Sequence, residues 1–279
     1  MKTRLTVLRH CKEFAKATAW AWDPIYRLFY CLCARPPFPA PPMDNRRRVG
    51  SIRLSHYYAS GYRCYAPLRD AINRYGSRPL ADLRILDFGA GAGRVLGFFQ
   101  RECPSMYAVD VDDSAVAFLH GCFPQVHATR NDYAPPLSYP DGFFDVIYSI
   151  SIWTHLPLAM QRAWLTELRR VARAGALVLI TTAGLKALRH WQHNDPEWRD
   201  VTPSILESEG VVFRDYQSTL DRAKDLPGIG KLPYGLTVHS PSYIYKCWDL
   251  DFEVLHVAEG VVDYQDLVVL RKRGEVRLA

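Results

Sequence analysis

Residues 84–94 read Arg-Ile-Leu-Asp-Phe-Gly-Ala-Gly-Ala-Gly-Arg, and this stretch decides the expected fold. An apolar run over 83–86 predicts a short buried strand that leads into Asp87, and amphipathic spacing over 94–101 predicts a helix. The glycines between them stand at alternate positions: Gly89, Gly91 and Gly93. A strand, a glycine turn and a helix in this order allow bare backbone N–H groups to approach a ligand closely.

A second apolar run, over 106–109, ends at Asp110. A carboxylate at the end of the neighbouring strand can accept hydrogen bonds from both hydroxyls of a ribose. Together, the glycine turn and the two acids predict a nucleoside-binding site.

The residues around the turn indicate which nucleoside is bound. The dinucleotide fingerprint is Gly-x-Gly-x-x-Gly, but here Arg94 stands where the third glycine would be. Asp87 also precedes the turn, and a carboxylate is a poor neighbour for a pyrophosphate but a good one for an ammonium group. S-adenosylmethionine (SAM) carries an ammonium and a sulfonium and no phosphate, so the charges favour SAM over NAD.

At this point the chain resembles the seven-strand, class I SAM-dependent methyltransferases. Residues 139–149 resemble the entry to that family's fourth strand, and 154–157 with 164–175 resemble the helix and glycine turn before its fifth strand at 176–182. The tail, 239–273, resembles a bacterial subgroup associated with glycan and secondary-metabolite biosynthesis.

The resemblance covers residues 46–273. Members of the subgroup often have cysteines between the glycines, where this chain has Ala90 and Ala92, which fill the same small space. The implied fold is α/β: a doubly wound, mostly parallel seven-stranded sheet with an antiparallel edge strand, a cap insertion after strand five and an N-terminal helical extension.

SAM is the expected cofactor, and no metal is expected. Asp87 is assigned to its methionine end, Asp110 to its ribose and Asn131 or Asp132 to its adenine amino group. The complete expected set is Asp87, Gly89, Ala90, Gly91, Gly93, Arg94, Asp110, Val111, Asn131, Asp132, Ser149 and Ile150.

The expected reaction is methyl transfer to an O or N atom of a small molecule or glycan by in-line displacement, for which alignment supplies most of the rate. A general base is needed only if the acceptor must lose a proton. His155 is the first candidate because strand four ends facing the transfer point; capping of the next helix is its alternative role. His239 and Tyr234 resemble positions that subgroup members place near the acceptor.

Two other functions stay open. A non-catalytic member of the fold would keep the pocket for structure or partner binding, and the intact set of two acids and three glycines argues against it. An NAD-dependent oxidoreductase is disfavoured by Arg94 and Asp87.

The positive charge is concentrated in the N-terminal part of the chain. Residues 1–48 hold ten Lys or Arg and three acids, a net of +7, whereas the remaining residues hold 25 and 26, a net of −1. A nearly neutral main domain argues against a nucleic-acid partner, which would require a basic stripe.

Residues 1–34 combine basic and aromatic side chains, which is typical of a segment lying on an anionic membrane. The alternative, a helix packed on the domain or on a second subunit, is favoured because no clean polar face emerges. A proline-rich connector over 35–42 follows, and Arg46, Arg47 and Arg48 are expected to form a solvated patch. The expected division is therefore an extension over 1–45 and a methyltransferase domain over 46–279.

The seven scattered cysteines are expected to be reduced. Neither a secretory signal nor a membrane span is recognisable, so a cytoplasmic location is expected, with peripheral membrane contact through 1–34 as an option. The oligomeric state is undetermined.

Helices are expected over 62–75, 93–102, 113–121 and 157–173, and strands over 83–88, 106–110, 125–129, 144–149, 176–182, 252–258 and 265–271. Such alternation is typical of a parallel sheet. Residues 186–239 have weak periodicity and are assigned to a substrate cap, with one helix near 203–209.

Overall fold

The computed structural model of the 279-residue chain describes residues 23–25, 27–28, 32, 36–215, 232–250 and 252–274. Contacts divide the chain into two compact units, Met1–Ser60 and Gly61–Ala279. Sequence analysis placed a boundary at 45/46, fifteen residues earlier than this division.

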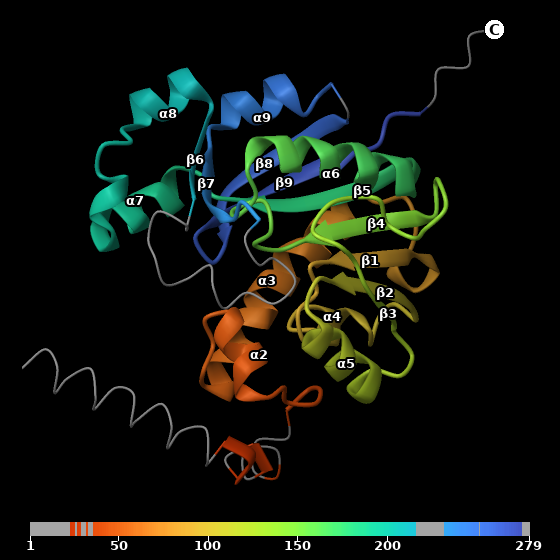
Figure 1. Ribbon diagram of the computed structural model, residues 1–279. Coiled ribbons are helices and arrows are strands. Elements are labelled where there is room, and N and C mark those ends of the chain that lie inside the picture. The colour runs from red at the N-terminus through yellow and green to blue at the C-terminus, as the bar shows by residue number, and fades with distance from the viewer. Residues whose placement is uncertain are drawn as a thin grey trace, which may run out of the picture. The chain divides into compact units, whose positions relative to one another are not determined.

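The larger unit contains a seven-stranded sheet in the order β3-β2-β1-β4-β5-β9-β8 (Figure 1). The strands are β1 (Arg84–Phe88), β2 (Ser105–Asp110), β3 (His127–Arg130), β4 (Phe144–Ser149), β5 (Ala172–Thr182), β8 (Glu253–Val262) and β9 (Gln265–Arg271). The first five run parallel, while β9 is antiparallel to β5 and to the outermost strand β8. The predicted doubly wound sheet with an antiparallel pair at its edge is confirmed.

The strand order reverses between β1 and β4. From β1 the chain moves outward to β2 and β3, and it then returns to β4 on the other side of β1. Ligands of doubly wound sheets bind beyond the carboxyl ends of the strands at such a reversal. Asp87 and Ser149 lie at these two strand ends.

The helices of the larger unit follow the strands. They are α3 (Leu54–Tyr75, which begins in the smaller unit), α4 (Leu96–Phe99), α5 (Asp113–Cys122), α6 (Leu158–Val171), α7 (Leu185–Asn194), α8 (Pro203–Glu209) and α9 (Pro241–Cys247), with 3-10 turns η1 (Leu80–Asp82) and η2 (Pro196–Trp198). The helix predicted to begin at residue 62 begins at Leu54 and contains Pro67.

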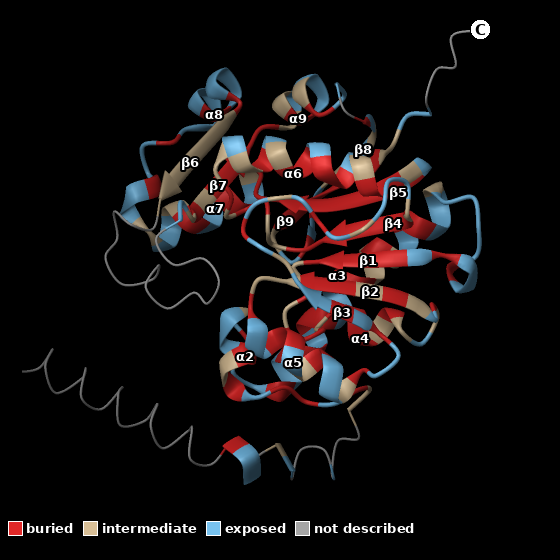
Figure 2. Ribbon diagram, turned by 45° about the vertical axis from the view of Figure 1, so that its right-hand side comes forward, coloured by how far each residue is buried: buried red, intermediate tan, exposed pale blue. Residues whose placement is uncertain are grey.

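Both faces of the sheet are covered, so β4 is buried along its whole length and β5 is buried from Ala176 onward (Figure 2). Alternate residues of β1 point to opposite faces. Phe88 packs against Trp164 of α6, with ring centroids 4.6 Å apart. On the other face, Phe99 of α4 packs against Tyr148 of β4 at 5.1 Å.

Helix α3 approaches the glycine turn closely at Gly61. A Cβ atom at this position would lie 2.4 Å from the carbonyl oxygen of Arg94, so any side chain would displace the turn. Tyr62, the next residue, and Tyr65, about one helical turn further along α3, pack against Phe98 with ring centroids 5.6 and 5.4 Å apart. Helix α3 therefore packs against the end of the glycine turn and against α4, which follows the turn.

The predicted cap insertion contains more regular structure than its sequence suggested. Besides α7, η2 and α8 it forms an antiparallel pair, β6 (Val211–Asp215) and β7 (Gly235–His239). Its helices and β7 share a separate apolar core, which includes Trp191, Trp198 and Val238. The predicted helix over 203–209 is confirmed.

In the smaller unit, the prediction of a solvated arginine patch is confirmed for Arg47 and Arg48 of α2 (Met43–Arg48), which are exposed, and is wrong for Arg46. The side chain of Arg46 is buried, forms an ion pair with Asp23, and donates to the carbonyl oxygens of Pro41 (2.8 Å) and Ile52 (3.0 Å). Arg46 thereby joins the proline-rich connector to the segment before it, because a buried guanidinium requires these acceptors.

Candidate functional site

The glycine turn adopts the conformation that its sequence predicts. Gly89, Gly91 and Gly93 have φ angles of +79°, +51° and +75°, which side chains rarely adopt. A Cβ at Gly89 would lie 2.4 Å from Ile152, and one at Gly93 would lie 2.9 Å from Leu119.

At Gly91, by contrast, a Cβ would meet no described atom within 4 Å. The turn therefore packs at both ends and exposes its centre, where a ligand could reach the backbone. Ala90 is buried, and its N–H, like that of Gly89, donates to the carbonyl of Val109.

Asp110, at the end of β2, holds the turn. Its Oδ2 accepts from the N–H of Gly91 at 2.7 Å, and its Oδ1 accepts from the N–H of Asp112 at 2.9 Å. Each carboxylate oxygen has a second acceptor site, so Asp110 can hold the turn and accept ribose hydroxyls at once. Asp112, the N-cap of α5, accepts from the N–H of Ser114.

Asp87 is buried at the end of β1 and accepts a 2.7 Å hydrogen bond from the hydroxyl of Tyr148. Burial raises the pKa of Asp87 to about 7, against the lowering effect of Tyr148. The charge of Asp110 raises this pKa further, and that of Arg94 lowers it. A cation bound beside Asp87 would lower its pKa because it stabilises the carboxylate. No local sequence pattern indicates this contact, which joins β1 to β4.

The end of β4 contains an unsatisfied polar atom. The hydroxyl of Ser149 is buried and has no hydrogen-bond partner among the described residues, and Ile150 beside it is buried. Ser151 then adopts a φ of +60°, which is uncommon for a residue with a side chain. Its N–H donates to Thr181 Oγ1 at 2.7 Å, and its hydroxyl contacts the amide of Gln265. Sequence analysis missed this support.

The predicted adenine contacts follow β3. The N–H of Asn131 donates to the carbonyl of Asp110 at 3.1 Å, which places Asn131 beside the β2 end. Its side-chain amide donates to the carbonyl of Asp132, which is exposed. Val111 is half-buried directly after Asp110. The four strand ends β1 to β4 therefore carry the predicted cofactor residues at one edge of the sheet.

His155 and Tyr234, predicted from distant parts of the chain, lie together. Their rings stack with centroids 4.9 Å apart and an interplanar angle of 16°. His155 Nδ1 lies 2.7 Å from the carbonyl of Gly235 and must donate to it, which leaves the lone pair of the neutral ring on Nε2. Burial lowers the pKa of His155, so the ring is neutral near pH 7.

His239 lies in a different environment. Its ring is fully buried, burial lowers its pKa to about 3, and Nε2 lies 2.8 Å from Gln161 Oε1. Gln161 in turn donates to the carbonyls of Trp153 and Leu156. His239 therefore supports the loop that carries His155, and its ring contacts the protein interior and not solvent.

The cap is joined to this loop by backbone hydrogen bonds. The N–H groups of Gly235 and Thr237 donate to the carbonyls of His155 and Thr154, at 3.0 and 2.9 Å. The hydroxyl of Thr237 adds a bond to the carbonyl of Leu156 at 2.7 Å. Movement of β7 would therefore move the loop after β4.

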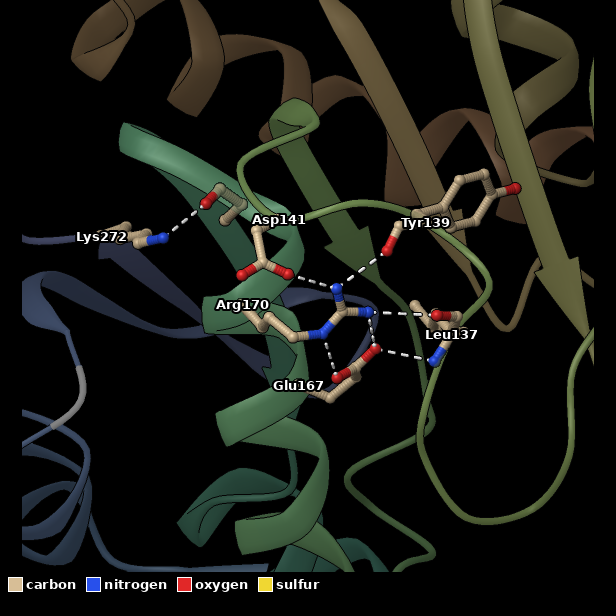
Figure 3. A network of polar contacts seen from close by, with 7 residues as sticks. Leu137, Tyr139, Asp141, Glu167, Arg170 and Lys272 are labelled. Carbon is tan, nitrogen blue, oxygen red and sulfur yellow. Dashed lines mark hydrogen bonds and ion pairs between the residues drawn. The ribbon is translucent and has the colours of Figure 1, made fainter.

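A polar network at the end of α6 fixes the segment between β3 and β4 (Figure 3). Arg170 donates to the carbonyls of Leu137 and Tyr139 and pairs with Asp141 and Glu167. These charge-assisted bonds raise the pKa of Arg170. The network fixes the far end of the segment that begins with Asn131 and Asp132.

The described residues contain no group of three His, Cys, Asp or Glu side chains that could hold a metal ion. In the same part of the chain, no helix is both long and apolar enough to cross a membrane.

Comparisons with known proteins agree with this geometry. A family model described as a methyltransferase domain matches residues 58–208, more than half of the chain. A doubly wound sheet with a glycine turn between two acids defines a Rossmann-like, methyltransferase-type protein. This chain belongs to the methyltransferase-domain family.

Solved structures share the fold at low sequence identity. The PH0226 protein from Pyrococcus horikoshii OT3 is 17% identical with a TM-score of 0.53, over 77% of this chain and 91% of that one. Magnesium protoporphyrin IX methyltransferase from Synechocystis PCC 6803, crystallised with bound SAH, is 14% identical with a TM-score of 0.53, over 89% and 99%. A SAM-dependent methyltransferase from Methanosarcina mazei is 17% identical with a TM-score of 0.50, over 73% and 97%.

Proposed function

We propose that this protein binds SAM at the ends of β1 to β4 and transfers its methyl group to an O or N atom of a small molecule or glycan. The observation that carries the proposal is the pair of carboxylates, Asp87 and Asp110, on neighbouring strand ends with the open backbone of Gly91 between them. The SAH bound to the Synechocystis methyltransferase supports the same choice of cofactor.

The donors and acceptors fit the parts of SAM. Asp110 would accept the ribose hydroxyls while holding Gly91, and Asn131 or Asp132 would bind the adenine amino group. Asp87 would attract the ammonium of the methionine part, and the buried hydroxyl of Ser149 would gain a partner there. A pyrophosphate beside Asp87 would be repelled, which disfavours NAD.

When bound, SAM supplies an already activated methyl group, so the protein's main task is alignment of the acceptor. We assign acceptor contact to His155 and Tyr234, which are held rigidly against each other by stacking and by the Gly235 carbonyl. For a hydroxyl or ammonium acceptor, Nε2 of His155 would take the proton. His239 is assigned a positioning role through Gln161.

Isothermal titration calorimetry with SAM, SAH and NADH tests the proposal. We expect binding of SAM and SAH at one site per chain, and no binding of NADH. Asp110→Ala should abolish SAM binding, because it removes both the ribose acceptor and the support of Gly91. Wild-type affinity in this variant, or tight NADH binding, would contradict the assignment.

The acceptor can be identified by mass spectrometry. The protein loaded with SAH is incubated with a metabolite extract, and the retained compounds are compared with those retained by His155→Asn. The incubation is then repeated with SAM instead of SAH. If a retained compound gains one methyl group under these conditions, catalysis is established. SAM binding without any methylated product would favour the non-catalytic alternative.

A further inference from the structure

Among the described residues of the segment before the proline-rich connector (23–25, 27–28 and 32), the apolar side chains are exposed and the charged ones make internal contacts. Asp23 is buried in an ion pair with Arg46, and Arg27 donates a hydrogen bond to the carbonyl of Ala40. Asp23 and Arg27 are four residues apart, so on a helix they share one face. This face is attached to the connector within the smaller unit.

Exposed apolar side chains occupy the other side of the segment. Ile25, Leu28 and Leu32 are 57%, 63% and 70% exposed, and each has helical backbone. Their i, i+3, i+7 spacing places them on one helix face, roughly opposite Asp23 and Arg27. Three large apolar side chains in one row on a solvent-facing helix mark an interaction surface.

The charge around this surface indicates its partner. The ten Lys or Arg and three acids of residues 1–48 give this part of the chain a net charge of +7, whereas the other 231 residues carry −1. An exposed apolar row within a stretch of net positive charge is complementary to an anionic lipid surface, into which apolar side chains insert while cations remain near the head groups. The aromatic residues of the same stretch suit this boundary: Trp20, Trp22, Tyr26, Phe29 and Tyr30.

We propose that the row of Ile25, Leu28 and Leu32 docks the protein reversibly on an anionic membrane surface. Sequence analysis favoured a packed helix because it found no clean polar face. That face consists of Asp23 and Arg27, which is evident only from their contacts with Arg46 and Ala40. The proposal is independent of the methyl acceptor and of SAM binding.

Vesicle co-sedimentation of the full-length chain tests the proposal. We compare vesicles of phosphatidylcholine alone with vesicles that contain phosphatidylglycerol as well, at low and high salt. Wild type should sediment with the anionic vesicles at low salt, and sedimentation should fall at high salt because screening weakens the attraction. The triple variant Ile25→Glu, Leu28→Glu, Leu32→Glu should partition at least about tenfold less.

The control is Leu250→Glu, which places one glutamate at a residue that is 84% exposed in the larger unit and should leave sedimentation unchanged. Circular dichroism should show the same helix content for all variants. If the glutamates unfold the segment, the milder triple variant Ile25→Ser, Leu28→Ser, Leu32→Ser replaces them in the sedimentation assay. Equal sedimentation of wild type and triple variant would overturn the proposal. A dimer in light scattering that the triple variant converts to a monomer, without vesicle binding, would also overturn it by identifying a second copy as the partner.

Discussion

Replacement of Tyr148 by Phe should weaken SAM binding in a pH-dependent manner. The hydroxyl of Tyr148 donates to Asp87 at 2.7 Å in the protein interior, where the pKa of Asp87 is about 7. A hydrogen bond to a charged group contributes about 1.5–3 kcal/mol, and one pKa unit corresponds to about 1.4 kcal/mol. The variant should therefore raise the pKa of Asp87 by about one to two units, to about 8–9.

The fraction of ionised Asp87 then sets the loss of affinity, because the ammonium of SAM binds the carboxylate form. At pH 7 about half of wild type is ionised, but only about 1–10% of the variant, so SAM should bind about five- to fifty-fold more weakly. At pH 6 the ratio should reach about ten to a hundred, and at pH 8.5 it should shrink to about one to four. The amino group of SAM titrates near pH 8, but it affects both proteins equally and cancels in the ratio.

Calorimetric titrations of wild type and Tyr148→Phe from pH 6 to pH 8.5 measure this ratio. Tyr58→Phe is the matched control, because it removes a buried tyrosine hydroxyl that donates to a backbone carbonyl, that of Phe38. A ratio that does not change with pH would show that Asp87 does not meet the cation, and the reasoning would be refuted.

Three further variants test other parts of the site. Gly89→Ala should lower the free energy of unfolding by about 1–3 kcal/mol in urea titrations, because its φ is +79° and the new Cβ would overlap Ile152. His155→Asn should lower kcat about 10²- to 10⁴-fold for a proton-bearing acceptor. Because the pKa of His155 is lowered, the wild-type kcat at saturating SAM should not fall until the pH is below 6.5. Arg170→Ala should reduce stability by about 1–3 kcal/mol, since the buried Glu167 loses its cation.

Each of these variants has a control. Gly121→Ala lies in α5, where the added methyl meets nothing within 4 Å, and it should be neutral or stabilising. His256→Asn makes the same change at an exposed histidine of β8, outside the assigned site, and Arg169→Ala changes an exposed arginine of the same helix as Arg170. Equal stability of the Gly89 and Gly121 variants would contradict the predicted strain at Gly89. An unchanged kcat for His155→Asn would contradict its role as the base. Equal losses of stability for Arg169→Ala and Arg170→Ala would contradict the role of the Arg170 network.

The parallel half of the sheet could be predicted from the sequence because its signals are local. The run from Leu86 through Asp87 into the glycines contains the strand, the turn and the start of the helix within a dozen residues. The strand at 144–149 and the helix at 203–209 have the predicted bounds. Strand three was predicted two residues too early at its start, since its sequence is short and half exposed.

The cap could not be predicted in the same way. Strand β6 pairs with β7, about twenty residues further along, and neither strand has strict alternation. The pairing depends on contacts of β7 with the loop after β4 and with Ala183. Such contacts between distant segments leave no local pattern in the sequence.

For the site, residue identities were predictable but their couplings were not. Asp87 and Asp110 stand out in the sequence, whereas the Tyr148–Asp87 hydrogen bond depends on the register of β1 against β4. The stacking of His155 on Tyr234 depends on the fold of the cap. The roles assigned to these residues toward SAM and the acceptor remain predictions.

A crystal structure of the full chain with SAH would test the central claim most directly. We predict that both ribose hydroxyls lie about 2.6–3.2 Å from the carboxylate of Asp110, with the amino group on the Asp87 side and the backbone of Gly91 against the ligand. SAH bound away from the ends of β1 and β2, or a ribose with no contact to Asp110, would contradict the account.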